Sequence, residues 1–214
     1  MPFFAELVAR TDEPRRAFEI NAAVLDAVSN GLPIERYRRL LLELYQIVWH
    51  FNPICATGAS RMTDEHQRVR HYLYDHLHEE AGHEEWVVND LRAIGVARET
   101  IQSYKPSMWT LGLIGYNYWA ADRRHPCSIL GMMYCLEVIA SVYGGPFSTA
   151  IRDSLMLEGI CGISFISSHA TLDANHMATL RTAVDLLIDE GAKDSVLEST
   201  EVNFHYITKV FESI

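Results

Sequence analysis

The sequence predicts an all-α fold, and three observations carry this prediction. Seven segments repeat apolar residues at the spacing of a helix, and none keeps the alternation of apolar and polar residues that marks a half-buried strand. Nothing repeats, and no Ser-, Gly- or Pro-rich linker divides the 214 residues. A chain of this length suits one compact unit with a substantial core. We therefore expect a single helical domain over residues 1–214.

The first three expected helices have recognisable ends. The first covers residues 14–31 and runs from a proline, favoured at the first helical position, to a glycine. The second begins at Ile34 and should break or kink at Asn52-Pro53. The third is unusually long, from the cap residue Thr63 to Gly95. The apolar residues expected to face inward on the first two are Phe18, Val24, Leu25, Val28, Tyr37, Leu41, Leu44 and Val48.

The remaining four helices complete the prediction. An aromatic-rich fourth helix spans residues 106–121, and a fifth runs from Pro126 to the stop signal Gly144-Gly145-Pro146, with a shorter helix after it to about residue 157. The sixth covers residues 163–190 and the seventh residues 195–212. The stretch SILGMMYCLEVIASVYGGP in the fifth is apolar enough to suggest a membrane span, but a buried core helix is the commoner explanation.

Composition narrows the class of protein. Half of the residues are hydrophobic (49%) and 21% are charged, as in a globular protein. The net charge of -10, with no basic run longer than a pair, argues against a nucleic-acid partner. The N-terminus shows no export signal, and the four cysteines are scattered without a CxxC motif. We expect a cytoplasmic protein with free thiols and no membrane partner.

Two of the predicted helices carry polar residues where a core should be. On the third, the inward stripe is apolar at both ends but reads His76, Glu80, His83 in its middle. On the sixth, the segment HATLDANH places His169, Asp173 and His176 on one face, again between apolar ends. Taken alone, a single histidine such as His76 is more often a core or surface residue than a ligand.

Glu137 adds a third carboxylate from the apolar fifth helix. Burying an isolated carboxylate costs several kcal/mol unless it is paired, and no Lys or Arg lies on these stripes. Divalent metal ions remove this difficulty. Imidazole and carboxylate together suit iron, manganese or zinc, and a thiolate-free set of three carboxylates and three imidazoles suits a carboxylate-bridged pair of iron ions. A ferritin-like fold fits poorly, because it would need two Glu-x-x-His motifs and only one lies on a helix here.

The order of these motifs resembles a known family. Glu80-x-x-His83 lies on a long predicted helix, a lone Glu137 lies on the next long apolar helix, and His169-x3-Asp173-x2-His176 lies on a later one. This order is similar to that of the haem-oxygenase-like diiron oxidases and oxygenases, which include the fatty-acid decarboxylase that forms 1-undecene. The resemblance runs over residues 45–178. It implies a seven-helix haem-oxygenase-like bundle.

The resemblance also implies a ligand set and a reaction class. The first iron would be held by Glu80, His83 and His169, and the second by Asp173 and His176, with Glu137 bridging or completing the pair. Two Fe(II) ions per chain, the second more weakly held, would activate O2 as co-substrate, and no haem is expected because no histidine precedes His50.

The substrate implied is a small carboxylate-bearing metabolite. A fatty acid or amino acid would undergo C–H abstraction with C–C fragmentation, or an amine would undergo N-oxygenation. Pocket walls are expected from five aromatic residues near the ligands, and either Arg123 or Arg124 can clamp a carboxylate. The five aromatic residues are Trp49, Phe51, Tyr134, Tyr143 and Phe165.

Two alternatives remain open. Thiaminase II and pyrroloquinoline-quinone synthase share the expected fold without the diiron ligands, and thiaminase-type chemistry needs a nucleophilic cysteine in the pocket. Cys135 is the candidate, although it lies two positions before Glu137 and so faces away from it on a helix. The second alternative is a non-catalytic metal-binding protein. A homodimer is the common assembly among folds of this kind.

Overall fold

The structure, a computed structural model, describes residues 2–214, with the side chains of residues 171–174 excepted. Within this part the chain is helical and has no strand, so the predicted all-α class is confirmed. It contains eleven α-helices rather than the predicted seven, with two short 3-10 helices, η1 and η2. Their bounds are α1 Phe3–Arg10, α2 Asp12–Glu19, α3 Ala22–Asn30, α4 Ile34–Arg61, η1 Asp64–His66, α5 Gln67–Glu79, α6 His83–Ala93, α7 Arg98–Ser103, α8 Met108–Arg123, η2 Pro126–Ser128, α9 Ile129–Leu155, α10 Ser164–Val184 and α11 Glu190–Ser213.

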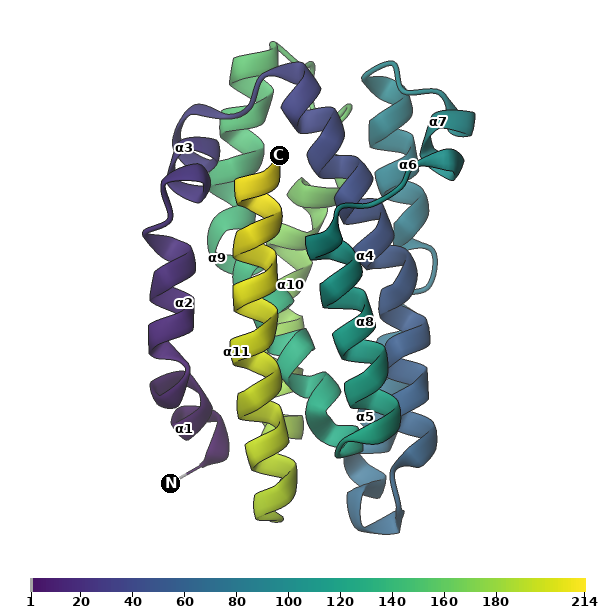
Figure 1. Ribbon diagram of the computed structural model, residues 1–214, viewed down its shortest axis with the longest axis vertical. Helices are drawn as coiled ribbons and strands as arrows, with labels where there is room; N and C mark the ends of the chain where they lie inside the picture. The colour runs from purple at the N-terminus through teal and green to yellow at the C-terminus, as the bar shows by residue number, and fades with distance from the viewer. Residues whose placement is uncertain (1) are drawn as a thin grey trace.

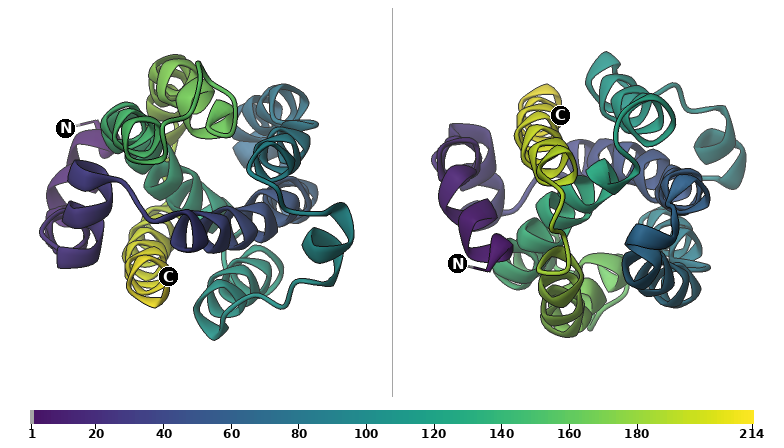
Figure 2. Two further views of the ribbon diagram at one scale, coloured as in Figure 1. Left: turned by 90° about the horizontal axis from the view of Figure 1, so that it is seen from above. Right: turned by 90° about the horizontal axis from the view of Figure 1, so that it is seen from below.

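The long helices run roughly along one axis (Figure 1), with the short helices α1, α2 and α3 following one another along one side. Viewed from either end (Figure 2), α9 lies among the other helices. It packs against α10, α11 and α3, and it contributes more buried residues than any other described helix. The core is therefore built around α9.

α9 explains the apolar stretch that resembles a membrane span. The segment Pro126–Leu155 is long and apolar enough to cross a membrane, but 67% of its most apolar window is buried. This burial identifies it as the core helix that the sequence predicts. The helix does not stop at Gly144-Gly145-Pro146 but continues to Leu155, because packing against neighbouring helices outweighs the lost backbone hydrogen bond at Pro146.

The N-terminal helices differ from the prediction. The expected helix over residues 14–31 is divided into α2 and α3, because the Asn21 side chain accepts hydrogen bonds from the N–H groups of Ala23 and Val24 and caps α3. Leu25, expected to face inward, is 50% exposed. α1 lies before the first predicted helix and was not predicted. Of the two outcomes expected at Asn52-Pro53, a break or a kink, the break does not occur, since α4 continues through Pro53 to Arg61.

The long third helix is interrupted where its polar residues lie. α5 ends at Glu79 and α6 begins at His83, separated by a turn in which Gly82 has a φ of 95°. Only glycine adopts this left-handed backbone without strain. Two smaller differences are that α7 was not predicted and that α10 ends at Val184, before the expected residue 190.

Candidate metal centre

Glu80 lies at the break between α5 and α6, and α6 begins at His83. The Glu80 backbone N–H still donates to the His76 carbonyl, at 2.9 Å, so the helical turn before Glu80 is intact. His76 and His83 are buried, and the Glu80 side chain is 10% exposed. The predicted inward stripe therefore survives the break, although Glu80-x-x-His83 is not on one continuous helix.

The first group of metal-binding atoms joins α6 to α10. His83 Nδ1 lies 2.8 Å from Glu80 Oε2 and 3.2 Å from His169 Nε2, and His169 Nε2 lies 3.7 Å from the same Glu80 oxygen. Adjacent ligands around an ion with bonds of about 2.1 Å are separated by roughly 3 Å. These three residues therefore have the spacing of ligands to one cation, and they are the three that the resemblance implies for the first iron.

A second group uses the other oxygen of Glu80. His176 Nδ1 lies 3.6 Å from Glu80 Oε1 and 3.4 Å from Glu137 Oε1. His76 Nε2 lies 3.8 Å from that same Glu137 oxygen. His76, Glu80 and His176 have ligand atoms within 4.8 Å of one another. Glu80 thus lies between the two groups, which is the bridging position that the sequence analysis offered to Glu137.

His76 is the residue that sequence reasoning left out of the ligand set. Neither of its ring nitrogens has a hydrogen-bond partner among the described residues, and the side chain is 2% exposed. Burial lowers the pKa of His76 to about 4, so at neutral pH the ring is uncharged and has a lone pair available for a cation. Its position on the inward stripe of the predicted third helix is the feature of the sequence that could have identified it as a ligand. Asp173, the remaining expected ligand, lies outside the described residues.

Electrostatics favour an ionised Glu80. Burial alone would raise the pKa of this carboxyl, but the hydrogen bonds with His169 and His83 outweigh it and hold the pKa well below its usual range. A buried carboxylate between imidazoles is a site of negative charge with several lone pairs directed at one space. Such a site attracts a metal ion.

The α10 histidine is oriented by hydrogen bonding. His169 Nδ1 lies 2.9 Å from the Phe165 carbonyl oxygen and donates its proton there, so Nε2, which faces His83 and Glu80, is the nitrogen that can bind a cation. The ring of Phe165 also packs on that of His169, with centroids 4.1 Å apart, and Trp86 stacks on His83 at 4.0 Å. These contacts limit the rotation of both imidazoles.

Asp90, which sequence reasoning missed, fixes the start of α10. This α6 side chain is 2% exposed and accepts hydrogen bonds from Ser164 N at 2.8 Å, Ser164 Oγ at 2.7 Å and Phe165 N at 2.8 Å. A carboxylate at the N-terminus of a helix satisfies free N–H groups and the helix dipole. Asp90 thereby ties α10, with its histidines, to α6. Its spacing of seven residues from His83 is the signal that the sequence offered.

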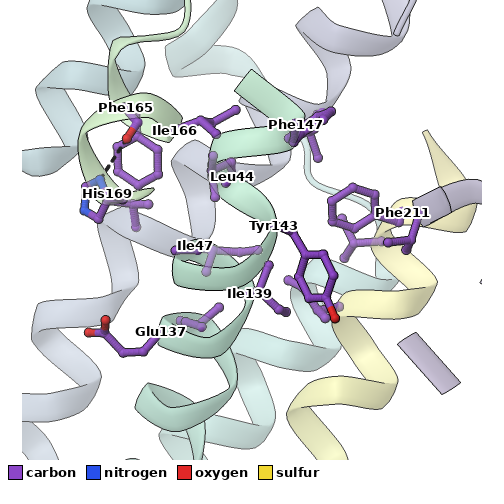
Figure 3. A pocket seen from close by; sticks show the side chains of 18 of the residues that line it. Leu44, Ile47, Glu137, Ile139, Tyr143, Phe147, Phe165, Ile166, His169 and Phe211 are labelled. Carbon is purple, nitrogen blue, oxygen red and sulfur yellow. Dashed lines mark hydrogen bonds between the residues drawn. The ribbon is translucent and has the colours of Figure 1, made fainter. Parts of the chain in front are cut away.

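An apolar cavity of about 170 Å³ opens onto the centre. Figure 3 shows Glu137 and His169 at one end of it, with Tyr143 and Phe211 at the other. Glu80 also lines it, and the rest of the wall is apolar apart from the phenol of Tyr143. Its apolar wall comes mainly from α4, α9 and α11, including Leu44, Ile47, Ile139, Phe147, Ile207 and Val210.

Half of the expected pocket residues line this cavity. Phe51, Tyr143 and Phe165 do so. The other three lie outside its lining: Trp49 is 51% exposed, Tyr134 is buried against Phe4 and Phe204, and Arg123 points outward to pair with Asp122. Arg124, the other candidate clamp, pairs with Glu198 on the surface. Helical periodicity identifies a buried face but does not separate the lining of a cavity from the packed core beside it.

Comparison with known proteins shows the family and the fold. A family model described as "Iron-containing redox enzyme" matches residues 38–202, and no curated protein matches the chain. A Shewanella denitrificans domain of unknown function with a haem-oxygenase-like fold has a TM-score of 0.87 at 22% identity, covering 100% of this chain and 91% of that one.

Two further solved structures have the same fold. Haem oxygenase from Leptospira interrogans has a TM-score of 0.81 at 18% identity, with 100% of both chains covered. A TenA homologue from Pseudomonas syringae has a TM-score of 0.83 at 14% identity, covering 98% of this chain and 91% of that one. Because the family model spans about three quarters of the sequence, the chain belongs to the family of iron-containing redox enzymes, and its fold is haem-oxygenase-like.

Proposed function

We propose that this protein is a non-haem diiron enzyme that uses O2 to oxidise an apolar, carboxylate-bearing substrate. The observation that carries the proposal is the position of Glu80, whose two oxygens belong to two different groups of metal-binding atoms. A carboxylate shared in this way is what a pair of ions needs to be held close together. The family supports iron as the metal.

The described residues fit such a pair. Glu80, His83 and His169 would hold the first ion, and His176, Glu137 and His76 would surround the second. The buried ring nitrogens of His76, which have no hydrogen-bond partner among the described residues, support a ligand there. When bound, two ferrous ions in a carboxylate and imidazole site supply the electrons that activate O2.

The cavity favours a fatty acid over an amino acid. Its charged or imidazole-bearing residues, Glu80, Glu137 and His169, all belong to the metal centre, so a substrate can place one polar group there and an aliphatic chain along the rest. The ammonium group of an amino acid would need a second polar partner. The apolar wall excludes water and aligns the chain so that its first carbons lie next to the metal centre. The expected outcome is C–H abstraction with loss of the carboxylate.

Observations weigh against the two related functions. Thiaminase-type chemistry needs a reactive thiol, but Cys135 is fully buried, does not line the cavity, and has a pKa raised well above its ordinary value by that burial. For haem, the first histidine of the chain, His50, contacts Tyr118 at 3.0 Å and does not line the cavity either.

Several expectations rest on the sequence alone and stay predictions. They are a cytoplasmic location, a homodimer, a single domain, and the absence of a nucleic-acid or membrane partner. The weaker binding of the second iron is another.

Anaerobic titration with ferrous iron, followed by O2 with alkanoic acids of increasing length, tests the proposal. We expect about two irons per chain and O2 consumption that depends on the acid. Glu80→Gln should lower the bound iron to one or fewer and abolish turnover, whereas the exposed neighbour Glu85→Gln should change neither. Two irons without substrate-dependent O2 consumption would indicate a metal-binding protein. Full activity in Glu80→Gln would contradict the bridging role.

A further inference from the structure

A second cluster of metal-binding side chains lies at the opposite end of α5. His66, His125 and Cys127 have ligand atoms within 4.8 Å of one another. They come from two separate connections: His66 from η1, between α4 and α5, and the other two from the connection between α8 and α9. The rings of His66 and His125 lie edge to face, with centroids 5.2 Å apart.

This cluster is separate from the candidate iron centre. His66 precedes His76 by ten residues, which corresponds to on the order of 15 Å along a helix. Its chemistry also differs, because it contains a thiol and the iron centre does not. Imidazole and thiolate together are typical ligands of zinc.

Burial and access both suit a bound ion. Cys127 is 0% exposed and His66 is 8% exposed, so these two side chains are held in place by their surroundings. The side chain of His125 is 25% exposed, which gives an ion a path from solvent. Such a site is open on one side, with room for a water molecule as a further ligand.

The ring of His125 is already oriented from both edges. Its Nδ1 accepts a hydrogen bond from the Cys127 backbone N–H at 3.3 Å, and its Nε2 lies 3.5 Å from Asp189 Oδ2. A histidine that binds a metal commonly has a carboxylate or backbone group at its other nitrogen. Both separations are long for hydrogen bonds, so exchanging one for a metal bond costs little.

Asp189 connects the cluster to a third part of the fold. Its Oδ2 also accepts a hydrogen bond from Ala192 N at 2.8 Å, which caps the start of α11. An ion at His66, His125 and Cys127 would therefore lie where η1, η2 and the start of α11 meet. Such an ion cross-links segments that are far apart in the sequence.

We propose that His66, His125 and Cys127 form a zinc site that links η1, η2 and the start of α11, with Asp189 supporting His125 and a water completing the coordination. On binding, the Cys127 thiol loses its proton to solvent and its sulfur donates an electron pair to the ion. No electrons are transferred. The site is independent of the iron chemistry proposed above.

Cobalt(II) is the probe that separates this site from the iron centre. The full-length, iron-free, reduced protein is titrated with Co²⁺, and the thiolate-to-cobalt charge-transfer absorption is recorded. We expect this absorption to reach its maximum at about one ion bound through sulfur per chain and to disappear when Zn²⁺ is added. The candidate iron centre has only nitrogen and oxygen ligands, so it gives no such absorption.

Variants of the cluster and a matched cysteine control complete the test. Cys127→Ser should abolish the absorption, and His125→Ala should weaken Co²⁺ binding at least about tenfold. Cys161→Ser, at the exposed cysteine, should leave the thiolate-to-cobalt absorption unchanged. Zn²⁺ at about a hundred times the wild-type Kd should raise the Tm of the wild type by at least about 3 °C more than that of His125→Ala, because any Zn²⁺ bound at the iron centre contributes equally to both proteins.

Two results would overturn the proposal. One is a folded wild-type protein that shows no thiolate absorption with Co²⁺ and no larger rise in Tm with Zn²⁺ than His125→Ala shows. The other is an absorption that survives in Cys127→Ser. Circular dichroism of each variant shows whether it has folded, and the His125→Ala result stands even if Cys127→Ser does not fold.

Discussion

Replacing Asp90 by alanine should loosen α10 and, with it, the metal centre. The buried Asp90 carboxylate accepts three hydrogen bonds from the first two residues of α10. His169 lies on the next turn of that helix, and His176 two turns further on. In Asp90→Ala the three donors lose their acceptor while their surroundings stay largely closed to water.

The size of the effect follows from these contacts. Losing the side chain that caps a helix costs about 0.5–2 kcal/mol, and each hydrogen bond to a charged group contributes about 1.5–3 kcal/mol. The desolvation of the Asp90 carboxylate, relieved by the substitution, offsets part of this. We expect the free energy of unfolding to fall by about 2–4 kcal/mol, a large share of a typical domain's stability.

Urea unfolding of the iron-free protein and ferrous iron titration measure the two consequences. Iron affinity should fall about 10–100-fold, as for other groups that orient ligands. Asp153→Ala, on the exposed Asp153 that pairs with Arg152, should change stability by less than about 0.5 kcal/mol. The reasoning is refuted if Asp90→Ala costs less than about 1 kcal/mol, or if it destabilises the protein and leaves iron affinity unchanged.

The pH dependence of Asp90 gives a second measurement. Burial raises the pKa of this carboxyl above its ordinary 3.8, and the hydrogen bonds from Phe165 and Ser164 only partly offset that. Between 3.8 and the raised pKa the folded state binds more protons than the unfolded state, so Asp90's contribution to stability decreases as pH rises through this window. The free energy of unfolding of the wild type relative to that of Asp90→Asn should therefore decrease as pH rises through this window, and it should be constant at neutral pH. A difference that grows as pH rises through this window would contradict this.

The remaining predictions concern packing, the thiol and the cavity. Gly131→Ala should destabilise the protein by about 3 kcal/mol in thermal unfolding, because a Cβ would lie 2.4 Å from the Val196 carbonyl oxygen. Gly115→Ala on α8, with nothing within 4 Å of the added Cβ, should instead stabilise it by about 0.5–1 kcal/mol, and equal effects would refute the close approach of α9 to α11. Cys135→Ala should leave kcat and KM unchanged within about twofold, whereas loss of activity would favour nucleophilic catalysis. Phe147→Ala should enlarge the cavity, so that kcat/KM for a longer fatty acid rises about tenfold relative to that for the fatty acid preferred by the wild type. An unchanged chain-length preference would place the substrate elsewhere.

The sequence predicted the fold class well and the ends of helices less well. Periodicity marks helices because it records which faces are buried, and that information is local. α4 and α9 continue through Pro53 and Pro146, because a proline inside a helix costs about 3 kcal/mol, which is less than the free energy that burial of these helices contributes. The break at Gly82 was missed for the opposite reason, since the apolar stripe continues on both sides of it.

For the candidate site, the sequence identified the residues better than their arrangement. Glu80, His83, Glu137, His169 and His176 stood out because polar groups interrupted apolar stripes, and the structure brings all five together. Which carboxylate lies between the two groups depends on the path of the backbone around Gly82, which spacing alone does not give. Asp90 was missed because capping joins two helices whose contact is visible only in three dimensions.

The interruption at Gly82 also changes the electric field at the centre. A continuous helix would present only its side to the ligands, whereas α5 ends at Glu79 and exposes the carbonyl groups of its last turn beside Glu80. The aligned peptide dipoles of a helix place roughly half a negative charge at that end. α6 begins at His83 and places roughly half a positive charge on the other side of the same turn. The turn therefore places a fixed dipole across the centre, and this dipole has no proton to gain or lose as pH changes.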